Sequence, residues 1–186
     1  MIYHIASLDF DGTLHYDGTE KDCIQLLKNS PENIINVINT GRGLNILLEK
    51  IKTYFKEDYH TFLQAFEYMI CNNGTDIYCK QNDTFVIFQE WFDYLNDQWN
   101  REDYLKLLLK TAADEDLELY PEAYNFKFLF YYYRKNIEEA QKVADVFRHI
   151  LKEKPVKLVC AKSSQPAPFC GQKFLIEIFP KKAGKT

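Results

Sequence analysis

The sequence lacks the features that direct a protein to a membrane, to nucleic acid or to secretion. No apolar run approaches the length of a membrane span, and the amino terminus lacks the charged start and long apolar core of a signal peptide. The formal net charge is −4 with Lys and Arg dispersed, so there is no basic stripe for a nucleic-acid backbone. We therefore expect a cytoplasmic protein with neither a nucleic-acid nor a membrane partner.

The sequence also lacks the cysteine and histidine spacings of disulfide frameworks and zinc sites. Its five cysteines are an odd number, with no Cys-x-x-Cys pair and no histidine at zinc spacing. The four histidines are isolated from one another and are typical of surface or packing residues. We expect reduced thiols, and a length of 186 residues suits one large domain or a small domain that carries an insertion.

An acidic motif follows the first apolar run. The run Ile2 to Leu8 predicts a strand, and Asp9-Phe-Asp-Gly-Thr-Leu14 follows it directly. Asp9 and Asp11 place two carboxylates at the carboxyl end of that strand, where open α/β sheets build their ligand sites. Gly12 allows a sharp turn and close approach of backbone amides to a ligand. The pattern favours a phosphoryl-transfer site over an ordinary acidic turn, and a calcium loop is excluded because its further acidic ligands and flanking helices are missing.

Strand and helix patterns alternate through the first 77 residues. Apolar runs at Ile34 to Ile38 and Tyr68 to Cys71 predict two more strands, and helices are expected at about 21–29 and 44–55. Polar glycine-containing turns follow the strands, as in a parallel sheet with crossover helices. The turns should therefore meet at one rim of the sheet.

The turn after the second strand carries Thr40 and Gly41. A threonine hydroxyl and a glycine N–H at the start of a helix suit an anion such as phosphate. An equally good interpretation of Thr40 alone is a cap for the helix that begins near Gly43. The acidic turn favours the phosphate site, because both turns follow successive strands and could share one pocket.

With these motifs the chain resembles the haloacid dehalogenase superfamily of phosphatases. Residues 9–14 resemble its first motif, residues 36–43 its second, and Asn72-Asn-Gly-Thr-Asp-Ile77 the turn that precedes a large cap. The segment from Phe174 to Thr186 is similar to the strand and turn that deliver the third-motif lysine, best matched by Lys185. Trp91, Trp99-Asn-Arg101 and Asn125-Phe-Lys-Phe128 are similar to the sucrose-phosphate phosphatase subgroup.

The resemblance implies an α/β fold, in which a Rossmann-like core with a parallel sheet carries an inserted α+β cap domain. The expected boundaries are 1–77 for the core, 78–172 for the cap and 173–186 for the return to the core. Within the cap, strands are expected at 84–88, 126–133, 156–160 and 174–179, with helices at 91–113 and 137–151.

The resemblance also implies a mechanism. Asp9 would attack phosphorus to form an aspartyl-phosphate, and Asp11 would act as acid and base. Mg²⁺, held by Asp9 and Asp11, is the expected cofactor. Thr40 and Lys185 would complete the catalytic set, although Lys185 could equally be a solvated lysine, and a Walker A loop is excluded because position 179 is Phe. The candidate substrate-binding residues are Gly12, Thr13, Gly41, Arg42 and Asn73.

The fourth motif of the superfamily, a Gly-Asp turn that completes the magnesium shell, has no counterpart before Thr186. We therefore expect an incomplete core sheet with its first strand on an exposed edge, a fragment of a longer protein more readily than a short relative, and little or no turnover from these residues alone. The favoured function is a magnesium-dependent sugar-phosphate phosphatase. A non-catalytic phosphate-ligand binding module, a truncated inactive relative and a phosphomutase are the alternatives, and the oligomeric state stays open.

Overall fold

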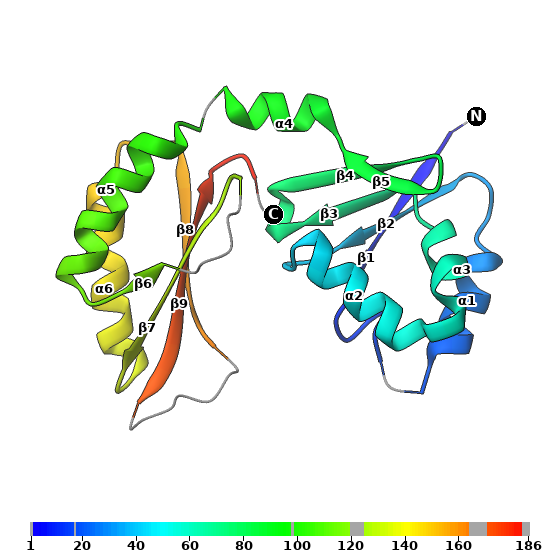
Figure 1. The fold of residues 1–186 in the computed structure, drawn as a ribbon, viewed down its shortest axis with the longest axis horizontal. Helices are drawn as coiled ribbons and strands as arrows, with labels where there is room; N and C mark the ends of the chain where they lie inside the picture. The colour runs from blue at the N-terminus through cyan, green and yellow to red at the C-terminus, as the bar shows by residue number, and fades with distance from the viewer. Residues whose placement is uncertain (1, 17, 98, 120–124, 164–170, 184–186) are drawn as a thin grey trace. The chain divides into compact units, whose positions relative to one another are not determined.

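The structure is a computed structural model that describes residues 2–16, 18–97, 99–119, 125–163 and 171–183. The chain divides into two compact units, Met1–Asp93 and Tyr94–Gly184. Each unit has its own sheet, one of five strands and one of four (Figure 1). Among the described helices, none has both the length and the apolar character needed to cross a bilayer.

The first unit is built on a sheet with the strand order β1-β2-β3-β4-β5. The first three strands are parallel, and β4 and β5 continue the sheet as antiparallel strands. β1 forms one edge of this sheet, in agreement with the exposed edge expected from the sequence. The bounds are β1 (His4–Asp9), β2 (Ile34–Asn39), β3 (Tyr68–Cys71), β4 (Asp76–Gln81) and β5 (Thr84–Ile87).

Three helices pack against the same face of this sheet (Figure 1). They are α1 (Glu20–Lys28), α2 (Leu44–Phe55) and α3 (Tyr59–Gln64), with the 3₁₀ turn η1 (Lys56–Asp58) between the last two. Ile24, Leu47 and Phe62 from the helices join Ile38 of β2 in one buried cluster. Helices that follow consecutive parallel strands lie on one face because each crossover has the same hand. The opposite face of β1 stays open, with Ile5 72% exposed.

The second unit contains an antiparallel sheet with the order β6-β7-β9-β8. Its bounds are β6 (Glu118–Leu119), β7 (Phe128–Arg134), β8 (Val156–Lys162) and β9 (Gln172–Pro180). Alternate residues of β7 are buried, and Phe130 lies 5.6 Å from Phe147 of α6 (Ile137–Ile150), measured between ring centroids. Aromatic side chains on this face of the sheet therefore form the core of the unit.

Two asparagines begin the helices of the second unit. Asn100 accepts a hydrogen bond from the N–H of Asp103 at the start of α5 (Arg101–Asp114), and Asn136 accepts one from the N–H of Glu139 at the start of α6. Both bonds satisfy amides that lack a partner within the helix. The prediction of a single helix at 91–113 is wrong. α4 (Gln89–Asn96) ends before Asn100, and Asn100 is the N-cap residue of a separate helix, α5.

The division of the chain differs in position from the expected domain boundary at 77/78. The hairpin of β4 and β5 belongs to the sheet of the first unit, because β4 pairs with β3 from Tyr68↔Cys79 to Cys71↔Asp76. The strand expected at 84–88 is thus the edge of the first sheet rather than part of the second. β9 pairs with β7 and β8, as expected for a cap strand at 174–179. The expected boundary at 172/173, which began the return to the core at residue 173, therefore falls inside a strand of the second sheet.

Candidate active site

The acidic motif forms a closed turn at the carboxyl end of β1. Asp9 ends the strand opposite Asn39 of β2, and its Oδ1 accepts a hydrogen bond of 3.1 Å from the N–H of Phe10. The fully buried ring of Phe10 anchors the turn, which closes where the N–H of His15 donates to the carbonyl of Phe10 at 2.8 Å. Gly12 has φ +77°, a left-handed conformation that favours glycine. The motif is therefore a hydrogen-bonded turn in which Asp9 and Asp11 are exposed to solvent.

The turn after β2 is built around a buried threonine. Thr40 is 1% exposed, and its Oγ1 accepts a hydrogen bond of 3.2 Å from the N–H of Arg42. The N-cap residue of α2 is Gly43, and no side chain caps the helix. The helix-cap interpretation of Thr40 is therefore wrong. The hydroxyl belongs to the turn itself, where it can still donate a hydrogen bond to an anion.

The start of α2 carries no acidic residue in its first turn. The corresponding turns of α1, α5 and α6 each contain two acidic residues. Acidic side chains near a helix N-terminus offset the partial positive charge of its free amides. At α2 that charge remains available beside Thr40 and Gly41.

The turn after β3 is locked onto the turn after β2. The N–H of Asn72 donates to the carbonyl of Arg42 at 2.9 Å, and the N–H of Asn73 donates to the carbonyl of Thr40 at 3.2 Å. Asn72, Asn73 and Gly74 all have positive φ, within the 3₁₀ turn η2 (Asn72–Gly74). A Cβ on Gly41 would lie 2.9 Å from Oδ1 of Asn73, so a larger residue at position 41 would require the asparagine side chain to move.

An ion pair joins the turns after β1 and β2. Arg42 donates from Nε to Oδ2 of Asp11 at 2.7 Å and from Nη2 to Oδ1 at 2.9 Å. These hydrogen bonds hold the pKa of Asp11 below its usual value, with weaker contributions from Lys50 and His15, and they raise the pKa of Arg42. The pairing brings together two segments that are 31 residues apart in sequence.

The structure thus collects most of the predicted site residues at one rim of the first sheet. Asp9, Asp11, Thr40, Gly41, Arg42 and Asn73 all lie in the three turns described above. Gly12 and Thr13 lie in the first of these turns and also line a separate cavity. Lys185 lies outside the described residues.

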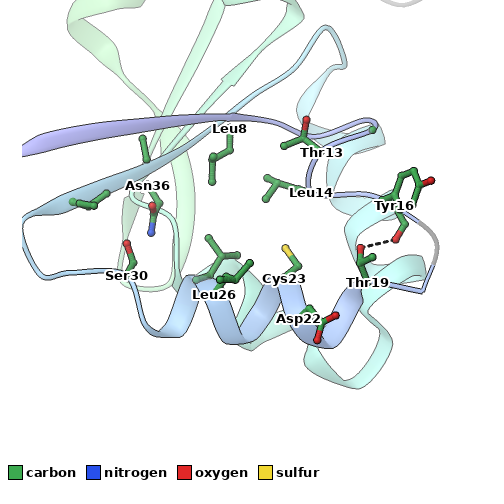
Figure 2. Close-up of a pocket in the computed structure, with 14 residues that line it drawn as sticks. Leu8, Thr13, Leu14, Tyr16, Thr19, Asp22, Cys23, Leu26, Ser30 and Asn36 are labelled. Carbon is green, nitrogen blue, oxygen red and sulfur yellow. Dashed lines mark hydrogen bonds between the residues drawn. The ribbon is translucent and has the colours of Figure 1, made fainter.

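The cavity of about 620 Å³ lies between β1, β2 and α1 rather than at Asp9 and Asp11 (Figure 2). Leu8 from β1 and Cys23 and Leu26 from α1 line it, together with Gly12 and Thr13. Its lining is mainly apolar, and burial raises the pKa of the Cys23 thiol. Asp9, Asp11 and Thr40, the expected catalytic residues that the structure describes, do not line this cavity. The cavity therefore does not mark the candidate site.

Residues outside the predicted set also lie at the rim. Nδ1 of His15 is 3.9 Å from Oδ1 of Asp11, although the sequence analysis placed no histidine in the site. The buried side chain of Asn72 donates from Nδ2 to Oδ2 of the buried Asp76. The spacing of four residues between Asp11 and His15 was the available signal for the first contact. The run Asn72-Asn73-Gly74, typical of left-handed backbone, was the signal for the second.

The groups at the rim that could bind a metal ion are carboxylate and amide oxygens, which are hard ligands. Within the described residues the buried Oδ1 of Asn39 has no hydrogen-bond partner, and Asn39 lies opposite Asp9 in the strand register. No group of three or more His, Cys, Asp or Glu side chains that could hold a metal occurs in that part of the chain. Mg²⁺ commonly binds one or two carboxylates and completes its shell with water and substrate phosphate, so Asp9 and its neighbours fit part of a magnesium site.

Comparison with family models gives a match to sucrose-6F-phosphate phosphohydrolase over residues 3–186. The chain belongs to that family. The match confirms the resemblance to haloacid dehalogenase phosphatases that the three motifs indicated. It also confirms the sucrose-phosphate phosphatase subgroup, to which Trp91, Trp99, Arg101 and residues 125–128 are similar. Comparison with curated protein sequences finds no match.

Solved structures with the same fold include the sucrose-phosphatase of Synechocystis sp. PCC6803 in complex with sucrose and phosphate. It is 20% identical with a TM-score of 0.65, over 98% of this chain and 66% of that chain. A haloacid dehalogenase-like hydrolase of Bacillus subtilis is 18% identical with a TM-score of 0.58, over 97% and 67%. The C-terminal domain of C. albicans trehalose-6-phosphate phosphatase is 15% identical with a TM-score of 0.53, over 98% and 59%.

These structures support the predicted fold class, a mixed α/β fold with a largely parallel sheet. The chain spans about two thirds of the length of the sucrose-phosphatase and of the Bacillus subtilis protein.

Proposed function

We propose that this chain carries the phosphoryl-transfer site of a phosphatase that hydrolyses a sugar phosphate. The observation that carries the proposal is the bidentate pair of Arg42 and Asp11, which joins the acidic turn to the Thr40-Gly41 turn. Two carboxylates and a set of anion-binding groups are thereby held at one rim. Family membership supports the class of reaction, and sucrose phosphate is the first substrate to test.

In the proposed reaction an oxygen of Asp9 attacks phosphorus and the bond from phosphorus to the sugar oxygen breaks. Asp11 gives a proton to the departing sugar oxygen, which leaves as an alcohol. Water then attacks the aspartyl-phosphate while Asp11 takes its proton, and inorganic phosphate and free Asp9 result. Two adjacent carboxylates suit these two roles, because one stays the nucleophile while the other moves the proton.

The phosphate oxygens would be held by groups of the second turn. The hydroxyl of Thr40 and the N–H of Gly41 donate hydrogen bonds, and the start of α2 adds partial positive charge. We assign the same task to Lys185. Charge on the transferring group grows at its equatorial oxygens, so donors fixed in place before the reaction stabilise the transition state.

Asp9 and the main-chain carbonyl of Asp11 would hold Mg²⁺. When bound, it offsets the repulsion between the phosphate and the two carboxylates and polarises the phosphoryl group. The carboxylate of Asp11 is assigned to proton transfer rather than to the metal, and in this structure Arg42 engages both of its oxygens. The first unit would act as the catalytic core, and the second unit would act as the cap that selects the sugar.

Phosphate release from a panel of sugar phosphates with Mg²⁺ tests the proposal. It is measured on this chain and on a chain extended past Thr186, because little turnover is expected from residues 1–186 alone. Asp9→Asn keeps the shape of the side chain and removes the nucleophile, so we expect a loss of about 10³-fold or more. Asp22→Asn, at an exposed position of α1, is the matched control and should leave the rate unchanged. Release that survives Asp9→Asn contradicts the nucleophile, and binding of sugar phosphates without release would replace the hydrolase with a binding module.

A further inference from the structure

One guanidinium holds both carboxylate oxygens of Asp11. Nε and Nη2 of Arg42 donate to Oδ2 and Oδ1 at 2.7 and 2.9 Å. Two parallel hydrogen bonds fix the plane of the carboxylate as well as its position. In this structure Nε and Nη2 of Arg42 are therefore both committed to Asp11, the residue that we assign to proton transfer.

The backbone of Arg42 is held on both sides by other turn residues, whereas its side chain is held by the exposed pair with Asp11. Its N–H donates to Oγ1 of Thr40 at 3.2 Å, and its carbonyl accepts from the N–H of Asn72 at 2.9 Å. Arg42 also follows Thr40 and Gly41 directly, so its side chain starts from the turn that we assign to phosphate. The guanidinium can change partners by rotation of side-chain torsions alone.

Both members of the pair are open to water. The side chain of Arg42 is 34% exposed and that of Asp11 is 41% exposed. Exposed ion pairs contribute little net free energy because water competes for both charges. A phosphate monoester carries more negative charge than one carboxylate and presents the same two-point geometry to a guanidinium. Phosphate bound at Thr40 and Gly41 would therefore compete well for Arg42.

We propose that Arg42 is a substrate-operated latch, which holds Asp11 in the free protein and moves to the phosphate when substrate binds. The inference rests on the proposed function of this site. Transfer of the guanidinium frees the oxygens of Asp11 for the sugar oxygen and then for water. His15, whose Nδ1 is 3.9 Å from Oδ1 of Asp11, stays beside the released carboxylate. Asp11 thus becomes available only when a phosphate is present.

The test is a double-mutant cycle on the binding of inorganic phosphate, measured by calorimetry in the presence of Mg²⁺. The variants are Asp11→Asn, Arg42→Gln and the double variant. If the latch must open for phosphate to bind, Asp11→Asn lowers the Kd about fivefold in the chain with Arg42. In the Arg42→Gln background the same change removes only a general repulsion and should lower the Kd less than about twofold.

A second exposed pair gives a matched control. Arg148 donates from Nη1 to Oδ1 of Asp145 at 2.6 Å within α6. Asp145→Asn removes a carboxylate from an arginine of similar exposure, and it should leave the phosphate Kd unchanged. An equal effect of Asp145→Asn and Asp11→Asn would overturn the latch.

The outcomes separate the latch from the function on which it rests. Phosphate binding with equal effects of Asp11→Asn in both backgrounds, or weaker binding after Asp11→Asn, overturns the latch and leaves the phosphatase proposal standing. A failure of the unaltered protein and of every variant to bind phosphate overturns both.

A measurement on the unaltered protein covers the case in which a variant fails to fold. The Nε–Hε resonance of Arg42 should shift during a phosphate titration, while that of Arg148 stays in place. A resonance of Arg42 that does not move while phosphate binds contradicts the transfer.

Discussion

The ion pair of the candidate site and a buried ion pair of the second unit lie in different places relative to their sheets. In Met1–Asp93 the candidate site lies in the turns that follow β1, β2 and β3. In Tyr94–Gly184 the ion pair of Lys127 and Glu177 lies at the sheet itself, and its Nζ and Oε1 atoms are 3.5 Å apart. Parallel strands all end at the same rim, so their turns meet there. Antiparallel strands end at alternate rims, so side chains converge on a face instead.

Burial follows the same difference. Lys127 is 3% exposed and Glu177 is 20% exposed, while Arg42 and Asp11 are about a third or more exposed. A buried pair is costly to break because the remaining charge stays in a poorly solvated place. An exposed pair can exchange partners at little cost. The comparison therefore predicts a structural pair in the second unit and an exchangeable pair in the first.

The largest expected effect is on the core of the second unit. Phe130 is fully buried against Phe147, and Phe130→Ala should lower the free energy of unfolding by about 3–5 kcal/mol through lost burial and a cavity. Urea denaturation measures the change, with Leu107→Ala at a 37% exposed position of α5 as the control. The folded variant should bind phosphate as before, and a large loss of affinity would contradict the assignment of phosphate binding to the first unit.

The next effect is on the ion pair of the second unit. Lys127→Met removes the cation beside Glu177 and should lower the free energy of unfolding by about 2–3 kcal/mol, because the carboxylate is left with less compensation. Adding Glu177→Gln to the same chain should restore part of that loss. Thermal unfolding of the single and double variants measures it, and purely additive losses would show that the pair is not coupled.

A smaller effect is expected at the contact between the second and third turns. The Cβ of Gly41→Ala would lie 2.9 Å from Oδ1 of Asn73, so the asparagine side chain must move. We expect a loss of about 0.5–1.5 kcal/mol in unfolding free energy and weaker phosphate binding. Asn73→Ala removes the obstructing amide, so Gly41→Ala should cost nothing further in that background. An equal cost in both backgrounds would exclude the contact as the cause.

The smallest effect concerns the exposed pair and depends on pH. Arg42 lowers the pKa of Asp11 in the folded protein below its value in the unfolded chain. The pair therefore stabilises the fold at pH values above the pKa of the unfolded chain, and this contribution is lost as the pH falls through the pKa of the folded protein. At pH 7 Arg42→Gln should cost less than about 1 kcal/mol, since both side chains are exposed. Chemical denaturation from pH 7 to pH 3 should show the two proteins converge at the acid end, whereas a gap that widens toward acid would contradict the sign.

Local patterns in the sequence were enough for several elements. The expected helix 44–55 coincides with α2, and those at 21–29 and 137–151 lie within one residue of the observed bounds at each end. The apolar spacing of these helices is strong and local. The break between α4 and α5 was missed, because its signal is a single cap at Asn100 inside a continuous helical pattern.

The hairpin of β4 and β5 shows a different limit. Asn82 and Asp83, both at positive φ, join β4 to β5 in a two-residue turn that the sequence displays. The sequence did not show which sheet receives the hairpin. Pairing of β4 with β3 decided this, and that choice depends on the reversal of the chain at Asn72–Gly74.

By itself the sequence was enough to propose the chemistry of the candidate site, because two carboxylates beside a glycine turn after a strand need only local order to be recognised. The meeting of Asp11 with Arg42 and the contact of Asn73 with Gly41 were decided by the tertiary structure alone. Both depend on which strands become neighbours in the parallel sheet. The hydrogen bonds between strands set that order, and they join residues far apart in the chain.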